Sequence, residues 1–299
     1  LLEFAEGNLD VAACQPKIKS LRKREEFEYA GAAGGFIDRY GYPFCRGRIF
    51  NTLETDRGQY DDICDIFWAS GAALFVRSEI YKKVGPFIFA HMEEIDLCWR
   101  IHLAGYHIAV VPQSTVYHLG GASLDAANPR KTYLNFRNNL LMLHKNLPCK
   151  EGKKTLFVRR LYDTLAFVRF ALLGQFSHAR AILRAHNDFR QMRKRYTEFP
   201  NTDLLKTFPE SGRNITIDYF LKGKNDSDKN RTTRFTAATN ASASAFVLYA
   251  ANEAALTLDT ERGHQRLRTM MPRANGNTQF IEQHTHIVVV YPVHQKRNN

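Results

Sequence analysis

Apolar and polar positions alternate along the first 150 residues in a way that predicts strands and helices in turn. Short apolar runs typical of buried strands occupy residues 11–14, 65–69, 72–77, 107–111 and 116–118. Amphipathic helical patterns occupy residues 1–10, 78–85, 89–104 and 129–143. Ser78 is expected to cap its helix, and the strands beginning at residues 11 and 107 are expected to end before Pro16 and Pro112. This order predicts an α/β fold with helices packed on a sheet.

Residues 27–57 are rich in glycine and aromatic side chains and show no helical period. This composition predicts a long loop with short strand pieces, and ordered loops of that length are often functional.

The second half of the chain has a different character. In residues 153–195, apolar side chains alternate with arginines, which predicts one or two basic amphipathic helices. The longest run without charge there, 170–179, is too short to span a bilayer. After Lys224 comes a polar, low-complexity linker and then a tail, in which His284 and His286 fit one face of an alternating strand. We therefore expect a domain over 1–150, a basic helical segment over 151–224 and a poorly ordered tail of unknown role over 225–299.

Composition and charge narrow the classes of protein. With 299 residues, 44% hydrophobic and 24% charged, the chain is neither disordered nor a disulfide-rich miniprotein. Five cysteines without a CxxC pair favour a reducing compartment and argue against structural zinc. Residues 1–150 hold 18 Lys and Arg against 17 Asp and Glu, whereas 151–225 hold 15 against 7. A neutral domain followed by a basic segment predicts an anionic partner such as phosphates or an acidic membrane, and we expect no nucleic acid partner.

The densest chemistry lies in the sequence FAHMEEIDLCWR at residues 89–100. Glu93, Glu94 and Asp96 would gather three carboxylates at one helix start, which is costly unless a cation or a proton-transfer role offsets their repulsion. The alternative is an acidic first turn favoured by the helix dipole, with Asp96 paired to Arg100.

Two further groups carry candidate chemistry. His118 follows a strand in the sequence VYHLGGAS, where the glycines would let a ligand approach, although a lone histidine at a strand end is more often structural. The sequence NPRKTYLNFRNN places Tyr133, Arg137 and Asn138 on one helix, and a guanidinium group suits a diphosphate. The alternative there is an ordinary amphipathic helix with a charged outer face.

The order of these segments resembles the second half of family 2 glycosyltransferases, most of all the bacterial rhamnosyltransferase type. The ordered set is ASGAALFVRSEIYKKVGPF, FAHMEEIDLCWRIHLAGYHIAVVP, VYHLGGAS and RKTYLNFRNNLLML, and the resemblance covers about residues 1–224. It implies a GT-A fold, which is Rossmann-like, a nucleotide-diphospho-sugar donor and a divalent cation, Mg²⁺ or Mn²⁺. The family's nucleotide-binding strands and main acidic metal ligands would precede Leu1, so we expect a partial GT-A domain with weak donor binding and little turnover by itself.

The resemblance also assigns roles to single residues. Glu94 falls where the family usually has the aspartate that serves as catalytic base, within the acidic pair Glu93-Glu94, and Asp96 is a competing candidate. Arg100 falls on a recurrent arginine, and Gly71 on the small residue that opens the acceptor side. His118 falls on a histidine that completes the metal site or contacts the diphosphate. Arg137, with Asn138 and Tyr133, is expected to bind substrate.

The expected function is therefore sugar transfer, by inverting displacement, to the hydroxyl of a glycan or lipid-linked acceptor. The basic helices would hold the enzyme at the cytoplasmic face of the cell membrane. The alternative is a membrane-peripheral binding or scaffold module without catalysis. A metal hydrolase or deaminase, suggested by His91-x-Glu93, lacks the PCxxC sequence that such enzymes need.

Overall fold

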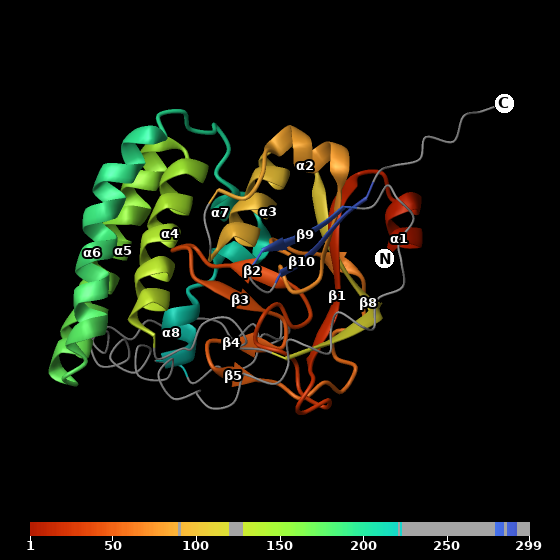
Figure 1. The fold of residues 1–299 in the computed structure, drawn as a ribbon, viewed down its shortest axis with the longest axis horizontal. Helices are drawn as coiled ribbons and strands as arrows, with labels where there is room; N and C mark the ends of the chain where they lie inside the picture. The colour runs from red at the N-terminus through yellow and green to blue at the C-terminus, as the bar shows by residue number, and fades with distance from the viewer. Residues whose placement is uncertain (89–90, 120–127, 221, 223–278, 284–285, 292–299) are drawn as a thin grey trace.

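A six-stranded mixed sheet forms the centre of the protein (Figure 1). The computed structural model describes residues 1–88, 91–119, 128–220, 222, 279–283 and 286–291. The strand order is β6 (Cys64–Asp65), β8 (His107–His118), β1 (Val11–Ser20), β7 (Leu74–Arg77), β10 (His286–Tyr291) and β9 (Gln279–Gln283). β1 is parallel to β8 and antiparallel to β7. The predicted α/β class is confirmed, whereas His284 and most of the predicted tail lie outside the described residues.

Neither Pro16 nor Pro112 ends its strand, which corrects the sequence prediction. β7 pairs with β1 only at Ala13 and Cys14, so Pro16 comes where that ladder has already ended and its missing N–H breaks no bond to β7. The register with β8 shifts directly after Pro16, from its partner Val111 to Thr115, and Pro112 falls within this irregularity. The bulge therefore accommodates both prolines, and the two strands continue in parallel to Ser20 and His118.

The glycine-rich segment builds a second, small antiparallel sheet. Its strands are β2 (Gly35–Ile37), β3 (Pro43–Cys45), β4 (Arg48–Ile49) and β5 (Thr52–Leu53). The predicted loop with short strands is therefore confirmed. A Cβ atom at Gly35 would lie 2.2 Å from the indole of Trp68, so only glycine fits there. The Trp68 indole N–H donates to the Phe36 carbonyl at 2.8 Å. The glycine thus permits the contact that fixes this sheet against the rest of the core.

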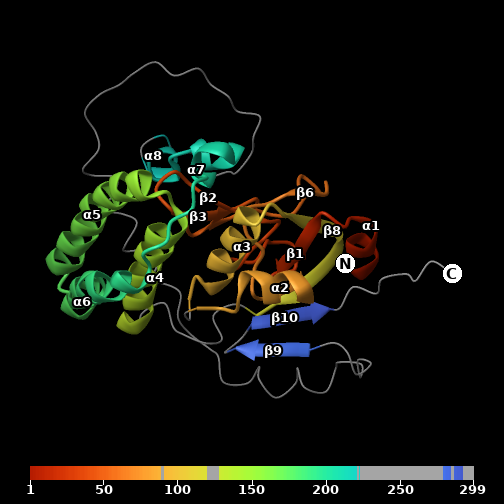
Figure 2. The same ribbon diagram turned by 90° about the horizontal axis from the view of Figure 1, so that it is seen from above.

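Short helices cover both faces of the large sheet (Figure 2). α1 (Leu2–Gly7) packs on a small cluster with Val11 and Cys14, and α2 (Ser78–Val84) and α3 (Glu93–Leu103) lie on the opposite side. Gly85, at φ +87, ends α2 as expected. Ser78 was expected to cap this helix but is its first residue; Arg77 holds the cap position. None of the five cysteines forms a disulfide.

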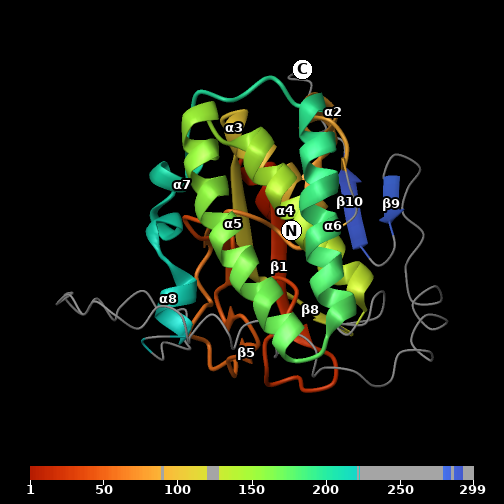
Figure 3. The ribbon, with the colours of Figure 1, turned by 90° about the vertical axis from the view of Figure 1, so that its left-hand side faces the viewer.

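Three long helices form a bundle beside the sheet. They are α4 (Pro129–Asn146), α5 (Cys149–Leu172) and α6 (Phe176–Met192), followed by η1 (Arg193–Arg195). Figure 3 shows α5 and α6 on the outer side of this bundle. The Asn128 side chain accepts from the Arg130 N–H at 2.9 Å and caps α4, with Pro129 in the first turn as predicted. Within the described residues, no helix combines the length and hydropathy needed to cross a bilayer.

After the bundle the chain returns to the small sheet through α7 (Leu204–Thr207), η2 (Pro209–Gly212) and α8 (Ile215–Phe220). The Phe208 ring lies against Phe36 and Phe67, with ring centroids 6.2 Å and 5.3 Å away. The buried carboxylate of Asp38 accepts from the Ile215 N–H at 3.3 Å. Residues 204–219 therefore share the main hydrophobic core with the first 150 residues.

The Asp38 carboxylate should make stability pH-dependent. Burial raises the pKa of Asp38 to about 6, although it accepts N–H bonds from Tyr40 and Tyr42 at 2.9 Å. Because the folded pKa lies above the unfolded value, the native state binds more protons between pH 4 and 6, and the Asp38 contribution weakens as the pH rises. Relative to Asp38→Asn, the wild type should lose on the order of 2 kcal/mol of unfolding free energy between pH 4.5 and 7. Urea unfolding at both pH values measures this difference, and a constant difference would contradict the expectation.

Candidate active site at the start of helix α3

α3 begins at Glu93, four residues later than its sequence pattern predicts. Its start is set by His91 and Met92, which have φ values of 67° and 65°, in the left-handed region that non-glycine residues rarely adopt. Residues 89–90 lie outside the described residues. Backbone strain of this kind costs on the order of 1–3 kcal/mol per residue and concentrates at functional sites.

Two asparagines of α4 hold the strained segment in place. The Asn138 side-chain amide donates to the His91 carbonyl at 2.9 Å. The amide of Asn139 donates to the Gly41 carbonyl at 2.6 Å and lies 3.6 Å from the Met92 sulfur. Asn138 was expected to bind substrate, but it is fully buried and engaged with the backbone of this segment. It therefore positions the start of α3.

The first turn of α3 places two glutamates beside each other. Glu93 is 3% exposed, and Glu94 is half-buried. The positive end of the helix dipole favours ionised carboxylates at these positions. One carboxylate oxygen of each glutamate is buried, so the acidic turn is not a fully solvated helix tip.

Asp96 differs from the two glutamates because other side chains hold it on all sides. Its carboxylate is completely buried and pairs with Arg100 at 3.0 Å and with Lys145. The Asn146 side-chain amide donates to it at 2.8 Å. Asp96 therefore joins α3 to α4, and this geometry does not support the predicted role as a competing catalytic base.

Arg100 also makes structural contacts, although it was expected to bind substrate. Its guanidinium donates to the carbonyls of Gly85 at 2.8 Å and Pro86 at 3.0 Å, and to that of Val84. It thus fixes the segment that follows α2 while it pairs with Asp96. The predicted i,i+4 pair between Asp96 and Arg100 is confirmed.

Arg137 and Tyr133 lie together on α4, as their spacing predicts. The Arg137 guanidinium donates to the Tyr133 hydroxyl at 2.9 Å and to the Asn138 amide oxygen at 2.9 Å. The Tyr133 hydroxyl in turn donates to Asp188 of α6 at 2.6 Å. This network links the bundle to the residue that holds the start of α3.

His118 ends β8, at the carboxyl edge of the parallel pair β1 and β8. Its Nδ1 atom lies 3.6 Å from the buried carboxylate of Glu28, a residue that no sequence motif singled out. Two side chains are too few to hold a divalent cation, and no group of three potential ligands occurs among the described residues. These residues alone do not fit the expected Mg²⁺ or Mn²⁺.

Gly71, which was expected to open the acceptor side, is buried in the turn between β6 and β7. This turn precedes the glutamates of α3 in the sequence. The neighbouring Ser70 N–H donates to the Gln15 side chain at 2.7 Å, which ties this turn to β1.

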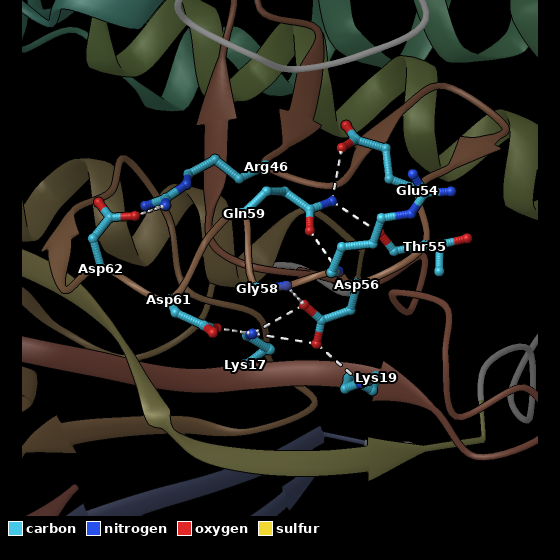
Figure 4. Close-up of polar contacts among 11 residues, drawn as sticks. Lys17, Lys19, Arg46, Glu54, Thr55, Asp56, Gly58, Gln59, Asp61 and Asp62 are labelled. Carbon is cyan, nitrogen blue, oxygen red and sulfur yellow. Dashed lines mark hydrogen bonds and ion pairs between the residues drawn. The ribbon is translucent and has the colours of Figure 1, made fainter.

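A polar cluster on β1 was not predicted from the sequence. Gln15, Lys17 and Lys19 alternate on one side of the strand and are buried or half-buried. Figure 4 shows the two lysines meeting Asp56, with Lys19 at 2.9 Å and Lys17 at 3.1 Å from its carboxylate. Burial raises the pKa of Asp56, but bonds from Lys19, the Gly58 N–H and Lys17 outweigh it and lower that pKa overall. Asp56 therefore favours its ionised form, between the buried Lys17 and the half-buried Lys19.

Comparison with known proteins adds no family assignment. No model of a known protein family matches this chain. No curated protein sequence matches it either.

Proposed function

We propose that this protein is a glycosyltransferase that moves a sugar from a nucleotide-diphospho-sugar to a hydroxyl of a glycan or lipid-linked acceptor. The proposal rests on the ordered motifs of residues 69–143 and on one structural observation, the half-buried Glu94 at a helix start that follows two strained residues. It takes the resemblance to the GT-A glycosyltransferases as its starting point.

In the proposed reaction Glu94 is the general base. Its carboxylate takes the proton of the acceptor hydroxyl while that oxygen attacks the anomeric carbon. The bond from the anomeric carbon to the diphosphate breaks on the opposite side, and the nucleoside diphosphate leaves with the electron pair, so the anomeric configuration inverts. The helix dipole supports the ionised form of Glu94, which is the form that accepts a proton. The three partners of Asp96 argue against this role for its carboxylate.

Other residues would position or stabilise the reactants. Arg137 offers guanidinium donors that suit the charge developing on a diphosphate. Asn138 would act indirectly by holding the His91 carbonyl and with it the orientation of Glu94.

The direct test is sugar transfer by the full gene product. UDP-, dTDP- and GDP-linked sugars are supplied with a membrane extract rich in lipid-linked glycans, and release of nucleoside diphosphate and labelling of the acceptor are measured. We expect acceptor-dependent release with at least one donor. Absence of both release and labelling with all three donor classes would contradict the proposal.

We further propose that the protein binds the cytoplasmic surface of the cell membrane. Membrane binding without catalysis is the alternative function. Side chains on α5 and α6, the outer helices of the bundle in Figure 3, support this proposal. Large apolar side chains are exposed there: Phe157, Leu161, Val168, Leu172, Leu173, Phe176 and Leu183. Exposed basic residues surround them: Lys153, Lys154, Arg160, Arg180, Arg184 and Arg190. The single acidic residue between 152 and 187, Asp163, is buried. A cationic face with an apolar stripe fits an anionic lipid surface.

Removing part of the apolar stripe should release the protein from vesicles. Phe157 is 62% exposed and Leu161 53% exposed, so glutamate at both positions should fold but repel an anionic surface. With phosphatidylglycerol vesicles, Phe157→Glu/Leu161→Glu should lower the partition coefficient about tenfold. Co-sedimentation measures the partition coefficient, and phosphatidylcholine vesicles are the lipid control. Leu9→Glu is the protein control, because Leu9 is exposed but lies outside α5 and α6. Equal binding by all three proteins would contradict a docking role for this face.

A further inference from the structure

Two buried cations each pair with a residue of one exposed acidic loop. Lys17 of β1 has a side chain 5% exposed, and Arg46, between β3 and β4, has one 9% exposed. The Arg46 guanidinium lies over the Tyr60 ring, 4.9 Å from its centroid. Figure 4 draws both cations in one polar cluster with the loop that carries Asp61 and Asp62.

Each of these cations meets one of two consecutive aspartates. Asp61 pairs with Lys17 and Asp62 with Arg46, and the two carboxylate side chains are 60% and 65% exposed. Figure 4 shows them reaching the cations from the same loop. Asp61 and Asp62, which we call the acidic latch, therefore cover buried cations while remaining largely in water.

The charges beneath the latch do not balance without it. Lys17, Lys19 and Arg46 supply three positive charges, whereas the largely buried Asp56 and the half-buried Glu54 supply two negative charges. Glu54 accepts from the Tyr60 hydroxyl at 2.9 Å and from Gln59 at 3.3 Å. Buried cations need an anion beside them, whereas ion pairs formed by exposed carboxylates are weak. An external anion can therefore replace the latch at small cost.

The cluster also lies where a ligand is expected. Lys17 and Lys19 occupy the last part of β1, and Ser20 at its end pairs with His118 of the parallel strand β8. In open α/β sheets, ligands bind beyond the carboxyl ends of parallel strands. The end of β1 that carries Lys17 and Lys19 therefore lies beside the edge at which His118 and Glu28 meet.

We propose that Lys17 and Arg46 form a phosphate-binding site, and that the acidic latch occupies it until a phosphate or diphosphate group displaces the two carboxylates. Resting on the proposed function, the ligand is the diphosphate of a lipid-linked acceptor. Binding involves no covalent step, since Asp61 and Asp62 exchange places with the phosphate oxygens.

The test measures the binding of inorganic pyrophosphate by isothermal titration calorimetry at constant ionic strength. In Asp61→Asn/Asp62→Asn the competing charges are gone, so we expect binding about tenfold tighter than in the wild type. Lys17→Met, in the same background, should abolish that gain. Glu25→Gln/Glu26→Gln is the matched control, because it removes two adjacent negative charges near the end of β1 and should leave the affinity unchanged.

Thermal unfolding supplies a second readout. Asp61→Asn/Asp62→Asn should melt at a lower temperature than the wild type in chloride, and pyrophosphate should raise its Tm more than that of the wild type. Lowered Tm without this rescue, or equal affinity of the latch variant and the control, would overturn the proposal. If the double variant does not fold, Asp61→Asn alone is held to the same criterion.

The source of the phosphate is decided by a second ligand. A water-soluble prenyl diphosphate that binds more tightly than pyrophosphate supports the lipid-linked acceptor, whereas equal affinity limits the site to free phosphates and overturns that assignment. These measurements require no sugar transfer. Failure of the anion site is therefore distinguishable from failure of the proposed transferase activity.

Discussion

Replacing Asp96 with alanine should destabilise the protein by about 3–5 kcal/mol, the cost of leaving a buried charge without its partner. The carboxylate is completely buried, and the Lys145 side chain that pairs with it is 9% exposed. Arg100 keeps its backbone partners Gly85 and Pro86 in this variant, whereas Lys145 loses its counter-ion. Equilibrium urea unfolding measures the change, and Asp10→Ala, on the surface, should stay within about 0.5 kcal/mol of the wild type.

The loss should shrink as the pH rises. Burial already lowers the pKa of Lys145, although Asp96 opposes the shift. Without Asp96 that pKa falls further below its unfolded value, so the unfolded state binds more protons and stability increases with pH. The difference between Asp96→Ala and the wild type should therefore be smaller at pH 10 than at pH 7. A difference that does not change with pH would show that the buried ammonium is not the source of the instability.

The class of the fold could be predicted from the sequence because the apolar runs and helical periods of the first 150 residues are strong. The strand ends could not, since a proline ends a strand only where its missing N–H would break a ladder bond. At Pro16 the pairing with β7 has already ended, and a bulge absorbs the change of register. Stopping the strand at Cys14 also hid the alternation of Lys17 and Lys19, and with it the cation cluster.

The candidate site was predicted only in part, because residue type does not reveal burial. The resemblance pointed to Glu94 and left Asp96 as a competing candidate, and the partners Lys145 and Asn146, about 50 positions away in sequence, separate the two. Asn138 looked like a ligand-binding residue, yet it holds the His91 carbonyl. Such long-range partners follow from the packing of α3 on α4, which no local pattern specifies.

Glu94→Gln should lower the rate of sugar transfer by about 10²–10⁴-fold, because glutamine has nearly the same shape but cannot accept the acceptor proton. The donor KM should change little, since the carboxylate acts on the acceptor hydroxyl. The rise of rate with pH that reports ionisation of the base should also disappear. Steady-state kinetics of the full gene product across a pH series measures all three.

The comparison with other carboxylates distinguishes chemistry from folding. Glu79→Gln, in the first turn of α2 and exposed, changes the same group at the same kind of position and should leave transfer within about twofold of the wild type, as surface substitutions usually do. Glu94→Gln should keep the wild-type Tm, unlike Asp96→Ala. If Glu94→Gln retains full transfer while Glu93→Gln loses it, the base is Glu93. If both retain it, the acidic turn of α3 serves only the fold, and the proposed mechanism is wrong.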